Sequence, residues 1–108
     1  MALLLLGASH LARGQTRQAV ETLEPLSVAQ PNWAMAHLEL GIALARTGRG
    51  DEALKALRHA VRLKPDLPRA WLALGDHLSA MGDIRGADAA YTSHIRYSVR
   101  DPKLLVAG

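Results

Sequence analysis

Five histidines are the first side chains in this 108-residue sequence that could do chemistry, since imidazole binds metals and transfers protons. A zinc site needs several ligands, often two histidines four residues apart on one helix. The five histidines show neither that spacing nor a His-Glu-x-x-His motif, and they are His10, His37, His59, His77 and His94. We therefore expect structural or surface histidines and no metal site.

Nucleophilic catalysis has no better support in the sequence. There is no Cys, which excludes disulfides, thiol nucleophiles and cysteine-based metal sites. The five serines have no obvious base partner, and no carboxylate pair stands out that could do acid–base chemistry. They are Ser9, Ser27, Ser79, Ser93 and Ser98. We expect no catalytic residues, no cofactor and no enzymatic activity in this segment.

Charge gives little reason to expect a nucleic-acid partner. Thirteen Lys and Arg exceed ten Asp and Glu by only three. Lys55, Arg58 and Arg62 share one helical face, with Arg69 nearby, but no aromatic residues alternate with them as in single-strand binders. We interpret this basic stripe as a solvated outer face, with an RNA or membrane-surface contact as the alternative. We predict neither a nucleic-acid nor a membrane partner.

The opening residues "MALLLLGASHLARG" raise the question of a targeting signal. They have no basic region before the apolar run, and that run is shorter than a signal core. It is also far too short to span a bilayer. An ordinary buried helix is therefore the favoured interpretation, and we expect a cytoplasmic protein.

The elements that position these side chains follow from an internal repeat of 34 residues. A fixed period of this size indicates an array of supersecondary units. Six positions are identical in all three copies: Ala2/Ala36/Ala70, Leu4/Leu38/Leu72, Leu6/Leu40/Leu74, Gly7/Gly41/Gly75, Gly14/Gly48/Gly82 and Ala19/Ala53/Ala87.

Apolar residues at helical spacing predict two helices in each unit. The expected ranges are 2–13, 17–29, 33–46, 51–63, 68–81 and 84–98. In the second unit, Asn32 and Asp51 are expected to be N-caps, and Pro65 is expected to end the second helix.

The repeated glycines have two expected roles. Gly14, Gly48 and Gly82 come just after the first helix of each unit, where a left-handed C-cap favours Gly. Gly41 and Gly75 lie inside that helix, and we expect them to face Ala53 and Ala87 so that two backbones approach closely. A nucleotide-binding loop would need a preceding strand and a denser glycine run.

The pattern resembles the tetratricopeptide repeat. The third copy supplies Trp71, Leu74-Gly75, Leu78, Ala87 and Tyr91, and the second supplies Leu40-Gly41, Leu44, Ala53, Leu57, Ala60 and Pro65. The resemblance implies an all-α solenoid of three helix-turn-helix repeats plus the start of a further helix. The expected boundaries are 1–33, 34–67 and 68–100 for the repeats and 101–108 for the truncated helix.

The third copy departs from the pattern at its end. His94 stands where Ala60 stood, and Pro102 comes about one turn late, which predicts a longer last helix. A solenoid normally ends in a polar capping element, which neither end of this chain has. We therefore interpret the chain as a fragment of a longer array, and we predict self-association through the solenoid ends because apolar residues gather there.

The stretch "GDIRGADAAYTSHIRYSVRDPKLL" also resembles the repeat region that precedes the catalytic domain of bacterial sulfotransferase-like proteins. That resemblance covers about residues 75–108. It implies an alternative function as the substrate-presenting region of a sulfotransferase, with no donor-binding residue in this segment.

The family resemblance also implies a concave groove formed by the first helix of each repeat. The expected groove residues are Met35, Leu38, Glu39, Ile42, Arg46, Arg69, Leu72 and Asp76. Some family members clamp a terminal carboxylate with Lys and Asn, but here Leu4, Ala8, Glu39 and Ala73 stand at those positions. We therefore expect a protein-interaction scaffold that binds an apolar or amphipathic protein or peptide segment.

Overall fold

The computed structural model describes residues 2–99, which form six α-helices and no strands. The helices are α1 (Ala2–Ala12), α2 (Thr16–Ala29), α3 (Ala34–Arg46), α4 (Gly50–Leu63), α5 (Pro68–Ala80) and α6 (Ile84–Ser98). The all-α prediction is confirmed, while the further helix expected within 101–108 lies outside the described residues. No helix between residues 2 and 99 is long and apolar enough to cross a membrane.

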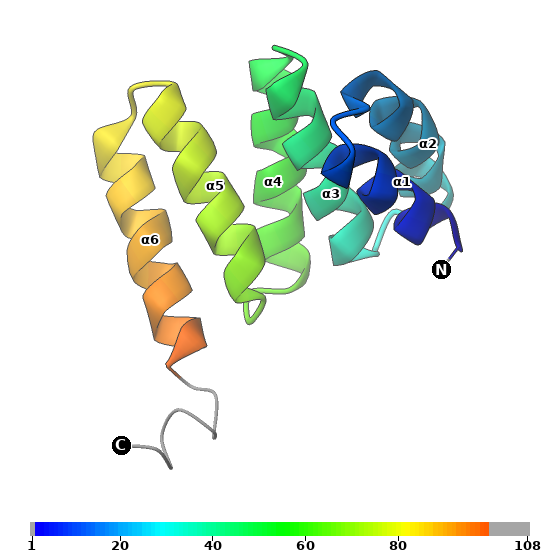
Figure 1. Ribbon diagram of the computed structural model, residues 1–108. Helices are drawn as coiled ribbons and strands as arrows, with labels where there is room; N and C mark the ends of the chain where they lie inside the picture. The colour runs from blue at the N-terminus through cyan, green and yellow to red at the C-terminus, as the bar shows by residue number, and fades with distance from the viewer. Residues whose placement is uncertain (1, 100–108) are drawn as a thin grey trace.

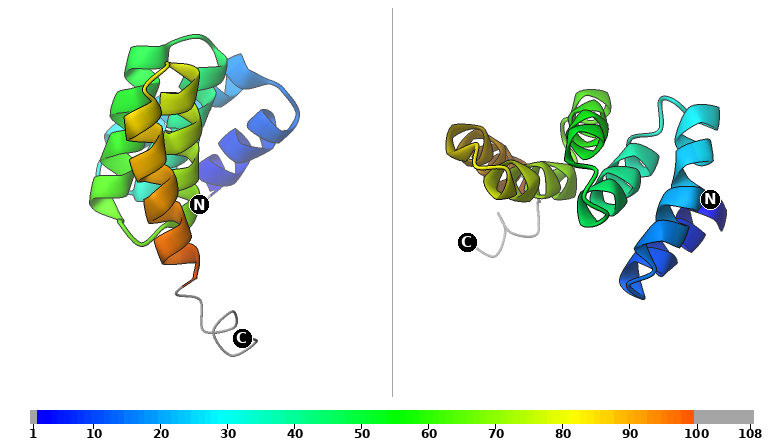
Figure 2. Two further views of the ribbon diagram at one scale, coloured as in Figure 1. Left: turned by 90° about the vertical axis from the view of Figure 1, so that its left-hand side faces the viewer. Right: turned by 90° about the horizontal axis from the view of Figure 1, so that it is seen from above.

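The helices form three pairs, α1 with α2, α3 with α4 and α5 with α6, that follow one another across the molecule (Figure 1). Viewed from above, the pairs follow one another along an arc (Figure 2). Each pair packs on the next through α2 against α3 and α4 against α5, and the first helices α1, α3 and α5 also contact one another in turn. The first helices therefore form one continuous face of the molecule.

The core consists of two apolar clusters, one for each junction between pairs. The first contains Leu23, Leu40 and Leu44, and the second contains Leu57 and Leu74. Met35 and Ile42 of α3 pack against both clusters, so the central helix joins the two halves of the core.

The turn inside each pair has the same hydrogen bonds in all three copies. Gly14, Gly48 and Gly82 have φ values of 77°, 82° and 87°, in the left-handed region where Gly carries no steric penalty. The residue after each glycine donates its N–H to a helix carbonyl over 2.8 to 3.0 Å, as in a Schellman motif. The predicted role of these glycines is confirmed.

The glycines inside the first helices have a different neighbour from the one predicted. A Cβ atom built on Gly41 would lie 2.7 Å from Leu57 Cγ, and one on Gly75 would lie 2.7 Å from Tyr91 Cε1. The close approach is as expected, but the partner is the large side chain one turn beyond Ala53 and Ala87. The glycine makes room for this bulky residue, and the prediction of an alanine partner was wrong.

The predicted N-caps of the second unit are also wrong. The two helices begin at Ala34 and Gly50, with Trp33 and Arg49 at the N-cap and no side-chain capping hydrogen bond at either. Asp51 instead lies in the first turn of α4, where its negative charge interacts favourably with the helix dipole. At α6 the carboxylate of Asp83 accepts a hydrogen bond from Gly86 N over 2.9 Å.

Candidate binding groove

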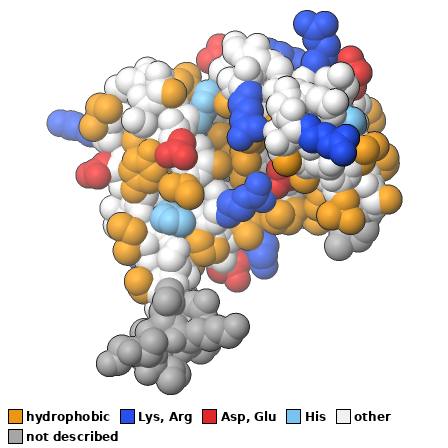
Figure 3. Space-filling model, in the orientation of Figure 1, with side chains coloured by type: hydrophobic (Ala, Val, Ile, Leu, Met, Phe, Trp, Pro, Cys, Tyr) orange, Lys and Arg blue, Asp and Glu red, His pale blue; other side chains and the backbone are white. Residues whose placement is uncertain are grey.

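The face built by α1, α3 and α5 is hollowed in two places that share Ile42, Arg46 and Arg69. The larger hollow, about 400 Å³, lies between α3 and α5, and the smaller, about 270 Å³, lies between α1 and α3. The two hollows adjoin at these shared residues, and together they are called the groove, which crosses the three helices. In the space-filling view, Lys and Arg side chains occupy the middle of this molecular face, between hydrophobic areas toward either end (Figure 3).

Five of the predicted groove residues line the larger hollow: Ile42, Arg46, Arg69, Leu72 and Asp76. Glu39 contributes to the floor of the smaller hollow, where its side chain is only 4% exposed. The other two belong elsewhere, because Leu38 is fully buried in the core and Met35 packs half-buried against both core clusters.

The two arginines of the groove have different partners. Arg69 forms an ion pair with the buried carboxylate of Glu39, so its charge is matched within the protein. Arg46 donates from Nη1 to the carbonyl oxygen of Leu11 over 3.2 Å, near the carboxyl end of α1. Among the described ion pairs, none joins Arg46 to a carboxylate. The guanidinium of Arg46 is thus positioned by a helix end and exposed to the groove.

Asp76 marks the opposite wall of the groove. Its Oδ1 accepts a hydrogen bond from the Tyr91 hydroxyl over 2.7 Å, which ties α5 to α6. That hydrogen bond, together with burial and the negative charge of Asp76, raises the pKa of Tyr91. The groove therefore has apolar residues such as Ile42 and Leu72, a cation on the α3 side and a hydrogen-bonded carboxylate on the α5 side.

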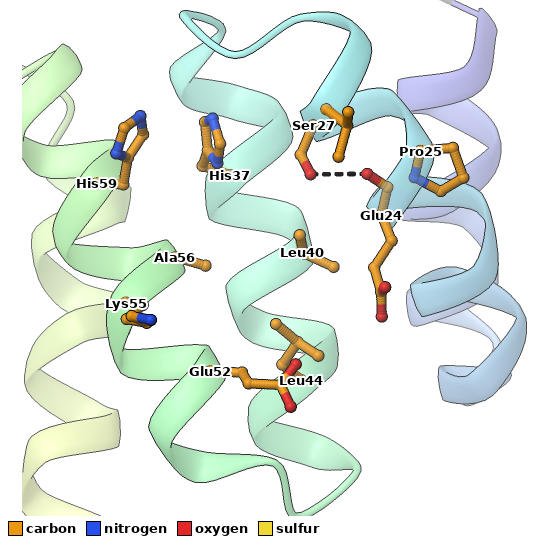
Figure 4. Close-up of a pocket in the computed structure, with 11 residues that line it drawn as sticks. Glu24, Pro25, Ser27, His37, Leu40, Leu44, Glu52, Lys55, Ala56 and His59 are labelled. Atoms are coloured by element: carbon orange, nitrogen blue, oxygen red, sulfur yellow. Dashed lines mark hydrogen bonds between the residues drawn. The ribbon is translucent and has the colours of Figure 1, made fainter.

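A third hollow, of about 650 Å³, lies between α2, α3 and α4 and was not anticipated from the sequence. Figure 4 shows His37 and His59 side by side at one end of it, with Leu40, Leu44 and Ala56 along the wall. The imidazole centroids are 4.3 Å apart, and the Nε2 atoms lie 2.8 and 3.3 Å from the carbonyl oxygen of Pro31.

One lining residue of this third hollow, His37, is smaller than its counterpart in the next repeat. Trp71, 34 residues later, donates from Nε1 to the carbonyl of Pro65 over 2.7 Å and stacks on Tyr97 with ring centroids 6.5 Å apart. His37 makes the same contact with Pro31 but has the smaller ring. This difference in side-chain size can be read from the sequence, because His37 and Trp71 occupy the same position of the repeat.

Two carboxylates that line the third hollow, those of Glu24 and Glu52, have an ion-pair partner in Arg49. Arg49 pairs with Glu24 over 2.9 Å and with Glu52, and these contacts raise the pKa of Arg49. Across residues 2–99, no three His, Asp or Glu side chains lie together as a metal site requires. Lys55 also lines this hollow, and none of the described ion pairs includes it.

The remaining histidines also have oxygen partners. His77 Nε2 lies 2.8 Å from the carbonyl of Gly50, and His94 Nδ1 lies 2.8 Å from that of Pro68. His10 Nδ1 lies 2.9 Å from Gln15 Oε1. The contacts of His77 and His94 link neighbouring helices, which agrees with a structural role.

Comparison with known proteins agrees with this architecture. The sequence pattern of the tetratricopeptide repeat matches residues 4–68, more than half of the chain. The chain belongs to the tetratricopeptide repeat family. Among curated proteins, none matches the sequence significantly.

Solved structures of other proteins share the fold. The type III secretion translocator chaperone SycD of Yersinia enterocolitica, in its alternative dimer, has a TM-score of 0.85 at 17% identity, over 98% of this chain and 80% of that chain. MamA 41-end of Desulfovibrio magneticus RS-1 has a TM-score of 0.86 at 25% identity, over 94% of this chain and 58% of that chain. The second repeat domain of Spaghetti (RPAP3), bound to the HSP90 peptide SRMEEVD, has a TM-score of 0.82 at 17% identity, over 89% of each chain.

Proposed function

We propose that this tetratricopeptide repeat chain is a non-catalytic protein-interaction module that holds a peptide or a segment of a partner protein in the groove of α1, α3 and α5. The observation that carries the proposal is the exposed guanidinium of Arg46 beside the apolar groove residues Ile42 and Leu72. The Spaghetti (RPAP3) domain, which has the same fold and is bound to a peptide, supports it by analogy.

The groove chemistry favours an amphipathic segment with a carboxylate placed toward Arg46. Apolar side chains of the segment would cover Ile42, Leu72 and Ala73, which removes apolar surface from water. Arg46 gains a charged partner that the described ion pairs of the free chain do not give it. Arg69 contributes less, since Glu39 already matches its charge.

Two further expectations remain proposals that rest on the sequence. The repeat boundaries are proposed at 1–33, 34–67 and 68–100, and the proposed location is cytoplasmic. The alternative function, the substrate-presenting region of a sulfotransferase, also stays a prediction. Reading the gene beyond Gly108 tests it, because a strand, a phosphate-binding loop and a helix would have to follow.

The groove proposal is tested with two synthetic amphipathic peptides of the same length and apolar pattern. One carries Glu and the other carries Lys on its polar face. We expect the Glu peptide to bind more tightly, and Arg46→Glu to weaken its binding about tenfold or more. Fluorescence anisotropy of the labelled peptides measures both affinities.

The matched control is Arg62→Glu, which changes the net charge equally but lies exposed on α4, away from the groove. We expect this variant to bind the Glu peptide nearly as the parent does at physiological salt, since distant surface charges are screened. Equal losses in the two variants would mean that net charge alone attracts the peptide, and the groove assignment would then be wrong.

A further inference from the structure

The two internal junctions of the solenoid are built from the same rows of residues. At the junction of α2 and α3, Leu40 and Leu44 share a core cluster with Val20 and Leu23. At the junction of α4 and α5, the residues 34 positions later, Leu74 and Leu78, pack in a cluster with Leu54 and Leu57. Repeat position therefore predicts which residues would meet if another helix pair were stacked on either end.

Both end faces leave large apolar residues of these rows exposed. On α1, Leu6 is 46% exposed, whereas its equivalents Leu40 and Leu74 are 7% and 5% exposed. On α6, Ile95 is 60% exposed, whereas its equivalent Val61 is 6% exposed. The two faces lie at opposite ends of the row of helices (Figure 1).

The end faces match each other row by row. If α1 of one copy takes the place that α3 and α5 take at the internal junctions, its Leu6 stands where Leu74 stands, opposite Tyr91. Its Leu3 stands where Trp71 stands, and Trp71 packs against the cluster of Val61, the equivalent of Ile95. Both leucines and Ile95 are exposed in the single chain, so this contact would bury large apolar side chains.

The third row differs from the internal junctions in a complementary way. Inside the solenoid this row is apolar on both sides, since Leu44 and Val20 belong to one core cluster and Leu54 packs against the cluster that contains Leu78. At the ends, the equivalent residues are His10 on α1 and Asp88 on α6. An imidazole facing a carboxylate forms a charge-assisted hydrogen bond, whereas two copies of Asp88 facing each other would repel.

We propose that the chain associates with a second copy of itself head to tail, with α1 of one copy stacked on α6 of the next in the register of the internal junctions. This contact joins two different faces, so it is heterologous and can add further copies in an open row. It leaves the groove of each copy open and is independent of the proposed peptide binding.

Two blocked variants test the direction of stacking. Leu6→Glu places a charge on the head face and Ile95→Glu places one on the tail face. We expect the parent chain to increase in mass with concentration, and each variant alone to remain monomeric. A mixture of the two variants has one intact head and one intact tail, so we expect it to form a dimer that grows no further. Size-exclusion chromatography with light scattering measures these masses.

The control variant is Leu5→Glu. Leu5 is also exposed on α1, but its repeat equivalent is the groove residue Glu39, so the substitution leaves the stacking rows intact. We expect Leu5→Glu to associate as the parent does. Circular dichroism of each variant confirms that the helices have formed.

A charge exchange tests the register independently. Asp88→Lys should weaken association about tenfold by removing the carboxylate that faces His10, and adding His10→Glu in the same chain should restore it with an ion pair. A parent that stays monomeric at every concentration overturns the proposal. So does an Ile95→Glu variant that associates like the parent, because that result would place the contact between two α1 helices.

Discussion

At the scale of single residues, the helix glycines set how closely the two helices of a pair approach. Gly41 lies against Leu57, and a Cβ at position 41 would be 2.7 Å from Leu57 Cγ and 3.3 Å from Leu57 N. We predict that Gly41→Ala lowers the free energy of unfolding by about 1–3 kcal/mol, because overpacking outweighs the gain in helix propensity.

A double-mutant cycle distinguishes a specific clash with Leu57 from a general intolerance of any side chain at position 41. In a Leu57→Ala background the side-chain obstacle is gone and only the contact with the backbone N of residue 57 remains, so Gly41→Ala should cost much less. Urea denaturation of the four chains measures the coupling. Additive effects of the two substitutions would show that Gly41 and Leu57 do not restrict each other.

His37 lines the third hollow and is also a titratable group. Replacing it with Trp, the residue at the same position of the next repeat, should fill part of the third hollow and keep a donor for the Pro31 carbonyl. We predict that His37→Trp raises the free energy of unfolding by about 1 kcal/mol at neutral pH. A thermal or urea denaturation curve that shows no gain would contradict this packing account.

The same residue makes stability depend on pH. Burial lowers the pKa of His37 below its ordinary value of 6.5, against the opposing effect of the Pro31 hydrogen bond and with a smaller contribution from the charge of His59. As the pH falls, His37 is therefore protonated in the unfolded chain before it is protonated in the folded one. Its contribution to the free energy of unfolding is complete above pH 6.5 and is lost as the pH falls toward the pKa of the folded state. His37→Gln, which does not titrate, should make the acid-side loss of unfolding free energy shallower. An unchanged slope would exclude His37 as its source.

At the scale of elements, the turns within the pairs depend on one backbone conformation. Gly48 has a φ of +82° and no atom within 4 Å of its Cβ position, so a substitution there is opposed by the backbone and not by crowding. We predict that Gly48→Ala lowers the free energy of unfolding by about 1 kcal/mol. Gly50→Ala is the matched control, since Gly50 begins α4 without a positive φ and should be neutral or slightly stabilising. Equal effects of the two substitutions on the urea midpoint would contradict the assignment.

The ion pair between Glu39 of α3 and Arg69 of α5 links two repeats across the groove. Because the Glu39 side chain is buried, Glu39→Lys would place an unmatched cation beside Arg69. We predict a loss of about 3 kcal/mol in the free energy of unfolding. Glu21→Lys is an equal charge change at an exposed position of α2 and should cost less than about 1 kcal/mol. Similar losses in the two variants would show that Glu39 has no special structural role.

At the scale of the whole molecule, the sequence predicted the helices within about two residues, because the 34-residue period marks each of them and the glycine turns separate them. It misassigned the partners of Gly41 and Gly75, since both the alanine and the larger residue one turn later lie on the facing side of the second helix. It also placed Leu38 in the groove, because helical spacing alone does not distinguish a residue at the groove edge from one turned into the core.

The groove was harder to predict than the fold because it depends on partners distant in sequence. Glu39 and Arg69 are 30 residues apart, and Arg46 binds a carbonyl 35 residues earlier in the chain. Charges in the sequence do not show which arginine is matched internally and which is open to a ligand. That distinction appears only when the three first helices are placed side by side.

The most direct test of the groove as the binding surface is a map of the amide shifts that the Glu-faced amphipathic peptide causes in the ¹⁵N-labelled chain. If the peptide binds in the groove, we expect the largest shifts on α3 and α5, at Ile42, Arg46, Leu72 and Asp76. Shifts concentrated instead around the third hollow, at Glu24, His37 and Lys55, with the groove amides unchanged, would contradict it.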